Sequence, residues 1–175
     1  MRPVSYTWDN AMVEGRRRLA LLEHSLDPST FRRLEGIGVA PGWRCLDVGA
    51  GGTLFVEEPD AISVRTLDRS GFRSLSLRVF EIVQSRGSHP DWSRDLPFKM
   101  TSLGLGNVRA EGETPYFRGA SELAEFWRLS WGRVRDAVAQ TGTDITQWDR
   151  ELAELDDPTR LFVSPMTIAV IATKA

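Results

Sequence analysis

Two apolar runs at residues 43–48 and 53–59, joined by only a few small residues, constrain this chain more than any other feature. The first run follows Pro41-Gly42 and is typical of a strand buried on both faces. Two parallel strands need a crossover of about a dozen residues or more, and the linker Gly49-Ala50-Gly51-Gly52 cannot supply one. The two strands are therefore expected to form an antiparallel hairpin, to lie end to end, or to belong to different partners.

The linker itself has two interpretations, and the sequence leaves both open. Its glycines allow positive φ and close approach of a ligand, as in the loop that follows the first strand of a nucleotide-binding fold. A glycine-rich segment between two apolar runs is also an ordinary turn signal. A dinucleotide fingerprint would need a further glycine at position 54, which is Leu54, so the pattern does not favour a nicotinamide cofactor.

The stretch Leu46-Asp47-Val48-Gly49-Ala50-Gly51-Gly52 resembles the first motif of class I S-adenosylmethionine-dependent methyltransferases. Residues 26–28 and 38–44 agree with this resemblance, and residues 107–129 and 155–165 are similar to the small-molecule branch of the family. The resemblance implies a Rossmann-like α/β fold, S-adenosylmethionine as cofactor and methyl transfer to a small-molecule acceptor. It also implies that the cofactor contacts are Asp47, Gly49, Ala50, Gly51 and Gly52.

The same resemblance implies that the middle of the fold is missing. Residues 53–59 are similar to the fifth strand of the family, so roughly ninety residues are absent at about 30 for each strand–helix–strand unit. We expect a single domain, 1–175, with a truncated Rossmann-like methyltransferase fold of about four strands and flanking helices. Its parts are N-terminal helices in 1–42, fused core strands in 43–59, and C-terminal helices and last strands in 60–175.

Three functional hypotheses follow from this truncation. The first is an active methyltransferase, for which the sequence identifies no catalytic base. The second is a non-catalytic remnant that acts as a binding, regulatory or dimerising protein, because the helix after the glycine loop and the acid that would hold the ribose are in the missing part. The third is a chain that does not fold as one domain, since broken parallel topology exposes apolar strand edges.

Four residues are candidate substrate contacts. The resemblance implies that the segment with Tyr6 and Trp8 forms a lid over cofactor and substrate; the alternative is that both side chains simply pack on the domain. It also implies that Glu57 and Glu58 border the substrate pocket, where either could act as a base or orient a hydroxyl group. The alternative is that both are solvated acids at the end of a strand.

Composition limits the partners. An apolar content of 41% and a formal net charge of −2 are typical of a globular protein and give no basic footprint for nucleic acid. The single cysteine excludes a disulfide framework and indicates a reducing, cytoplasmic location. No apolar stretch approaches the ~20 residues of a membrane span, and no secretory signal is recognised. Neither His24 nor His89 has a second ligand at metal-binding spacing, so no metal is expected.

The remaining pattern predicts individual elements. Apolar periodicity predicts helices over 72–83 and from Ser121 to Val138, and Asp144 with Gln147 predicts a capped last helix. Strands are predicted over 108–117 and 166–173. The small remnant sheet also allows two chains to pair, which makes a homodimer a further hypothesis.

Four local predictions concern residues near the expected pocket and the N-terminal helices. Asp27-Pro28 is expected to start a second helix with Phe31 facing inward. Residues 61–70 are expected to be irregular, and Arg16-Arg17-Arg18 is expected to lie on the solvated face of a helix. The aromatic pair Phe126-Trp127 is expected to pack in the core rather than to form a platform for a ligand.

Overall fold

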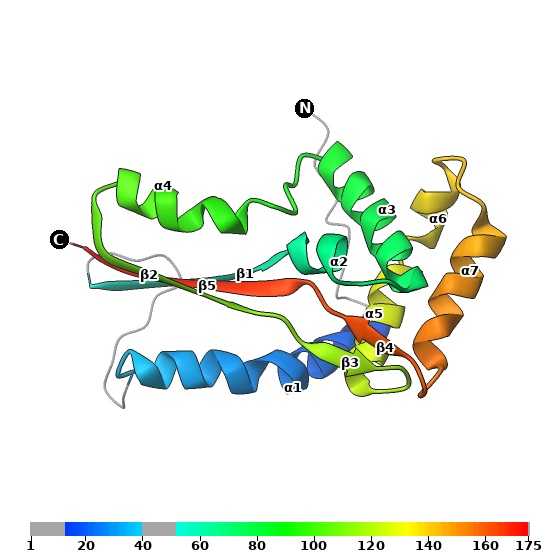
Figure 1. Ribbon diagram of the computed structural model, residues 1–175, viewed down its shortest axis with the longest axis horizontal. Helices are drawn as coiled ribbons and strands as arrows, with labels where there is room; N and C mark the ends of the chain where they lie inside the picture. Colours follow the sequence, from blue (N-terminus) through cyan, green and yellow to red (C-terminus); the bar gives the residue numbers. More distant parts are fainter. Residues whose placement is uncertain (1–12, 40–51, 175) are drawn as a thin grey trace.

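The computed structural model describes residues 13–39 and 52–174, and these residues form a mixed α/β structure around a small antiparallel sheet (Figure 1). The α-helices are α1 (Val13–Gly36), α2 (Ile62–Thr66), α3 (Gly71–Ser85), α4 (Leu96–Ser102), α5 (Glu122–Gly132), α6 (Arg135–Ala139) and α7 (Ile145–Ala153). The strands are β1 (Thr53–Asp60), β2 (Leu105–Glu113), β3 (Tyr116–Arg118), β4 (Leu161–Val163) and β5 (Met166–Lys174).

The main sheet has three strands in the order β1-β5-β2, and β5 is antiparallel to both neighbours. The two outer strands therefore run in the same direction, and the chain passes from one to the other through α2, α3 and α4. Val170 of β5 lies opposite Val56 of β1 and Ala110 of β2. A second ladder pairs β3 with β4, and the Ser164 amide donates to the Pro115 carbonyl at 2.9 Å where the two ladders meet.

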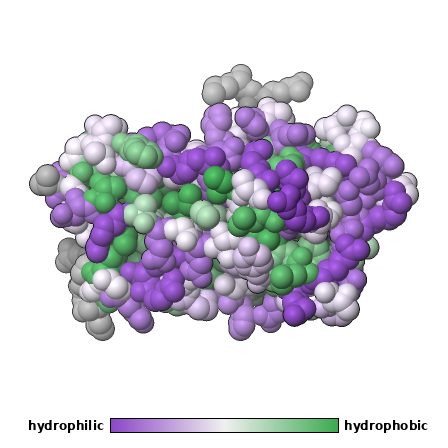
Figure 2. Space-filling model, viewed as in Figure 1, coloured by the Kyte–Doolittle hydropathy of each residue, from purple (hydrophilic) through white to green (hydrophobic). Residues whose placement is uncertain are grey.

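Two apolar clusters hold the described residues together. One lies among α3, α5, α6, α7 and the β3–β4 ladder, where Phe72, Trp148 and Phe162 are fully buried. The other lies between α4 and the main sheet, where Leu96 and Met100 pack on β5. Figure 1 shows α4 on one face of this sheet and α1 on the opposite face. On the face drawn in Figure 2, apolar residues form separate patches between hydrophilic ones.

Ionic contacts attach α1 to its face of the sheet. The Arg33 side chain is only 3% exposed and donates to Glu57 of β1 and, at 2.8 Å, to Glu113 of β2. Thr30 also donates to Glu57. The neighbouring Arg32 pairs with Glu113 at 2.9 Å, but its side chain is 61% exposed. A buried arginine that reaches both outer strands fixes the position of the helix against the sheet.

Several sequence predictions are confirmed. Residues 53–59 form β1, 166–173 form β5, and 72–83 form most of α3. Asp144 caps α7 by accepting from the amides of Thr146 and Gln147. The Gln147 side chain donates to Glu151 instead of completing a capping box. The predicted strand at 43–48 and its linker up to Gly51 lie outside the described residues.

Other local predictions are wrong for identifiable reasons. Asp27-Pro28 starts no second helix, because α1 continues through Pro28; the ionic contacts beyond it hold the helix in place despite the missing donor. Phe31 does not face inward and is 56% exposed. Residues 61–70 are not all irregular, since Ile62–Thr66 forms α2.

The strand and helix counts also differ from expectation. The described residues contain five strands, whereas about four were expected for the whole chain. The predicted strand 108–117 divides at Thr114-Pro115 into β2 and β3, because proline cannot donate to a ladder. The three-residue β4 is too short to give a sequence pattern. The predicted helix from Ser121 to Val138 divides into α5 and α6 between Gly132 and Arg135.

Candidate functional site

Glu57 and Glu58, near the end of β1, lie in different environments, although the sequence alone could not distinguish them. Side chains alternate between the faces of a strand, so Glu57 and Glu58 point to opposite sides of the sheet. Glu57 faces α1, where Thr30 and Arg33 occupy its carboxylate oxygens. Glu58 faces the side of α4 and lines a cavity of about 630 Å³. Glu57 is therefore a structural ion-pair partner, and Glu58 is the acid available to a ligand.

The walls of this cavity, which we name the Glu58 pocket, come from several elements. Strand β1 contributes Glu58 through Asp60, and α3 contributes Phe80 and Val83. Helix α5 contributes Phe126, Trp127, Ser130 and Trp131. The loop before α4 and the α4 helix form another side, and Arg18 of α1, a helix that packs on α5, also lines the pocket. The pocket thus lies where the end of β1 meets the helical part of the chain.

Aromatic side chains dominate the lining. Phe80, Trp92, Phe126, Trp127 and Trp131 all border the pocket. The Trp127 ring centroid lies 4.8 Å from that of Phe126 and 4.8 Å from that of Trp131. Phe80 meets Trp131 edge-on at 6.1 Å. This packing connects the wall to the buried helical core, which makes it a preformed apolar surface suited to a flat ligand.

The Glu58 carboxyl group is partly buried on the pocket side of β1. Burial raises the pKa of its carboxyl group above the ordinary value for glutamate, because a low-dielectric environment disfavours the charged form. No hydrogen bond to this carboxylate is found among the described residues. A carboxyl group in a cleft with a raised pKa is a candidate for proton transfer or for binding a hydroxyl or amine.

Asp60 also borders the pocket, but its carboxylate oxygens already have hydrogen-bond partners within the protein. Its side chain is fully buried and accepts from the Arg94 Nε atom at 3.0 Å, the Ser93 hydroxyl at 3.1 Å and the Ile62 amide at 2.8 Å. Burial alone would raise the pKa of Asp60, but these donors hold it below the ordinary value. Its oxygens are occupied, so Asp60 positions the segment before α4 rather than a ligand.

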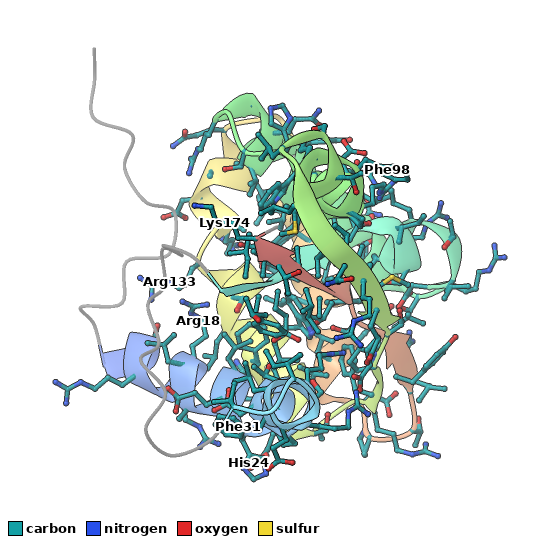
Figure 3. The ribbon with its side chains drawn as sticks, turned by 90° about the vertical axis from the view of Figure 1, so that its left-hand side faces the viewer. Arg18, His24, Phe31, Phe98, Arg133 and Lys174 are labelled. Carbon is teal, nitrogen blue, oxygen red and sulfur yellow. The ribbon has the colours of Figure 1, made fainter. Side chains whose placement is uncertain are left out.

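A basic side and a histidine complete the lining. The Arg18 guanidinium is 5.9 Å from the centre of the Phe126 ring, and the Lys99 ammonium is 5.8 Å from the centre of the Trp92 ring. In Figure 3 the Arg18 side chain points inward from α1, whereas those of His24 and Phe31 lie on the outer side of the helix. His89 is exposed at the rim. The Ala61 amide donates to the Pro90 carbonyl at 3.2 Å, and this hydrogen bond connects the loop that carries His89 to the end of β1.

Gly52 is the one predicted cofactor contact among the described residues, and it lies away from this pocket. It precedes the first residue of β1, has a φ of 91° and accepts from the Lys174 amide at 3.0 Å. Six residues of strand at ~3.3 Å each separate it from Glu58 by about 20 Å. Asp47, Gly49, Ala50 and Gly51 lie outside the described residues, as do the predicted lid residues Tyr6 and Trp8.

Among the described lining residues, only Glu58 was a candidate substrate contact from the sequence. Arg18 was expected to be solvated with its neighbours, yet it is only 7% exposed. Phe126 and Trp127 were expected to pack in the core, and this is confirmed, but both also line the pocket. The sequence did contain a signal for the burial of Arg18. Three consecutive residues of a helix point in different directions, so one of the three arginines must lie nearer the apolar face of this helix.

The chain matches no model of a known protein family, and it matches no curated protein. In the two described ranges, no group of three or more His, Cys, Asp or Glu side chains could hold a metal ion. Among the helices of this part of the chain, none has the length and apolar character to span a bilayer.

Proposed function

We propose that this chain is a small-molecule-binding protein of the S-adenosylmethionine-dependent methyltransferase type, and that the Glu58 pocket takes the acceptor-like ligand. One observation carries the proposal: a carboxyl group with a raised pKa stands in an aromatic cavity of about 630 Å³. Such a site suits a flat, largely apolar molecule that presents a hydroxyl or amine to Glu58. That volume lies within the range of ligand pockets in general.

The role of Glu58 in this proposal is to accept a hydrogen bond from the ligand and, in an enzyme, to take its proton. A base is most effective when its pKa lies near the working pH, and burial moves the pKa of Glu58 in that direction. The aromatic side chains from α5 hold the ring system of the ligand. Asp60 and Arg94 keep the β1 end and the segment before α4 in place around it.

The topology of the sheet supports the proposed family. Strands β1 and β2 run in the same direction and are joined by helices, and β5 inserts between them in the opposite direction. Crossovers through helices between strands of one direction are typical of doubly wound folds. The helical connection from β1 to β2 is therefore the feature of the described sheet that supports the proposed family, although every neighbouring pair in this sheet is antiparallel.

The position of Gly52 favours binding over methyl transfer within one chain. Gly52 lies about 20 Å along β1 from Glu58, so a cofactor held there would have to extend along most of this distance before its methyl group came within the ~3–3.5 Å needed for reaction. We therefore derive no transfer step. Methyl transfer remains the second candidate function, with cofactor contacts supplied by a second copy in a homodimer.

Calorimetric titration tests the first candidate. The probe is 2-naphthol, which combines a flat apolar body with one hydroxyl group. We expect saturable binding to the wild-type protein and about tenfold weaker binding to Glu58→Gln, because a hydrogen bond to a charged acceptor is lost. Glu81→Gln is the matched control, since this exposed acid of α3 does not line the pocket. Absence of binding, or equal loss in both variants, would overturn the proposal.

A separate titration addresses the second candidate. S-adenosylhomocysteine is added to the wild-type protein while the oligomeric state is recorded by light scattering. Micromolar binding by a dimer would support methyl transfer and justify an acceptor screen. A monomer that shows neither heat nor thermal stabilisation at millimolar ligand would exclude this second candidate and leave binding in the Glu58 pocket as the function.

A further inference from the structure

A lysine on the wall of the Glu58 pocket has no anionic partner in the part of the chain that the structure describes. Lys99 of α4 lines the pocket and is exposed to solvent. Its ammonium group lies 5.8 Å from the centre of the Trp92 ring, which also lines the pocket. Contact with an aromatic face favours this position for the cation. The charge of Lys99 is therefore available to a molecule that enters the pocket.

Glu58 and Lys99 lie on adjoining walls of this pocket. The Ser93 hydroxyl donates to the Pro59 carbonyl at 3.1 Å. This contact brings the segment that carries Trp92 to the end of β1, directly beside the residue that follows Glu58. The two charged side chains nevertheless form no ion pair with each other. One acid and one cation thus face the same cavity without neutralising one another.

The chemistry of the two side chains defines what a ligand must offer. A lysine ammonium group can only donate hydrogen bonds, and its bonds to charged acceptors are the strong ones. The Glu58 carboxylate needs a hydroxyl or amine donor instead. Because Lys99 is exposed, an anionic group that binds it stays in contact with water and avoids the large cost of burying a charge.

We propose that the ligand of the Glu58 pocket is an aromatic carboxylic acid that also carries a hydroxyl group, with the hydroxyl at Glu58 and the carboxylate at Lys99. This inference rests on the proposed binding function. The aromatic lining takes the ring that connects the two groups. Repulsion between Glu58 and the ligand carboxylate excludes the reversed orientation. Lys99 is then the residue that selects an acid over a neutral molecule of the same shape.

The test compares two probes that differ only in the carboxylate: 2-naphthol and 6-hydroxy-2-naphthoate. With the wild-type protein at low salt, calorimetry is expected to show about threefold to fivefold tighter binding of the acid, as an exposed ion pair provides. Raising the salt concentration to about 0.5 M should remove this advantage, because such a pair is screened. The affinity for 2-naphthol should change little.

Three variants assign the effect to one side chain. Lys99→Met keeps the stem over the Trp92 ring and should abolish the advantage of the acid without changing the affinity for 2-naphthol. Lys99→Arg should retain the advantage. Lys174→Met is the matched control, since it removes the same formal charge from an exposed residue that does not line the pocket. It should leave the advantage intact. Glu58→Gln should weaken the binding of both probes.

The outcomes separate this inference from the proposed function. Equal affinity of the two probes for the wild-type protein would overturn the assignment of the carboxylate while leaving 2-naphthol binding intact. An advantage that persists in Lys99→Met, or that Lys174→Met removes equally, would overturn the role of Lys99. Failure of 2-naphthol itself to bind would instead reject the proposed function.

Discussion

Replacement of Arg33 by methionine tests whether one buried cation holds α1 against the sheet. The Arg33 side chain is 3% exposed and contacts Glu57, Glu111 and Glu113. Methionine keeps the apolar stem and removes the charge, which leaves Glu57, only 15% exposed, without its cation. Breaking a buried ion pair in this way costs about 3–5 kcal/mol. We expect the lower end, about 3 kcal/mol, because Glu111 and Glu113 are partly exposed and remain solvated.

Thermal unfolding gives the assay, and Arg32 gives the control. At about 2–4 °C per kcal/mol for a chain of this size, Arg33→Met should lower Tm by about 6–12 °C. Arg32 contacts the same Glu111 and Glu113 at 3.1 and 2.9 Å, but it is 61% exposed. Arg32→Met should therefore cost less than about 1 kcal/mol. Equal Tm shifts for the two variants would refute the argument from burial.

Three further predictions concern stability. The lowered pKa of Asp60 contributes stability that is present above the unfolded-state value of about 3.9 and is lost as pH falls through the folded-state pKa. Asp60→Asn should thus cost about 2 kcal/mol in urea unfolding at pH 7 and less near pH 3; a constant cost would contradict this. The raised pKa of Glu58 contributes stability that is present below about 4.3 and is lost as pH rises through the folded-state pKa, so Glu58→Gln should gain stability over the wild type between pH 4 and pH 7. A pH-independent difference would argue against it. A Cβ on Gly119 would lie 2.0 Å from the Asp157 carbonyl oxygen, so Gly119→Ala should unfold the chain or cost more than about 3 kcal/mol. Gly36→Ala, with no atom within 4 Å of its Cβ, should change stability by less than about 1 kcal/mol, and similar circular-dichroism melts for these two variants would be the contrary result.

Three elements were predicted correctly from short sequence patterns, because the residues that determine them are close together in the chain. The apolar stripe of α3, the Asp144 cap of α7 and the β-branched run of β5 each specify their own conformation. Helix α1 was predicted as two helices because Asp27-Pro28 is a typical helix start, with Asp as the N-cap and Pro at the first position. Its continuity depends on contacts with residues far along the chain, such as Arg33 with Glu113, and no local pattern contains them.

The candidate site was predictable in part. The end of β1 was identified as the border of a pocket, and the alternation of side chains along the strand then separates Glu58 from Glu57. The residues that line the other sides of the pocket could be identified only from the tertiary structure. Arg18 belongs to the site only because α1 packs on α5, and Trp127 lines it only because α5 packs beside α3.

The most direct test of the account is the titration of Glu58 itself, followed by carbon-13 NMR of the side-chain carboxyl groups. In the free protein, Glu58 should titrate above the ordinary value of about 4.3. With 2-naphthol bound, its pKa should be lower than with 2-methoxynaphthalene bound, because only the naphthol donates a hydrogen bond to the charged form. Identical Glu58 titrations with the two probes would contradict the claim that Glu58 receives the hydroxyl group of the ligand.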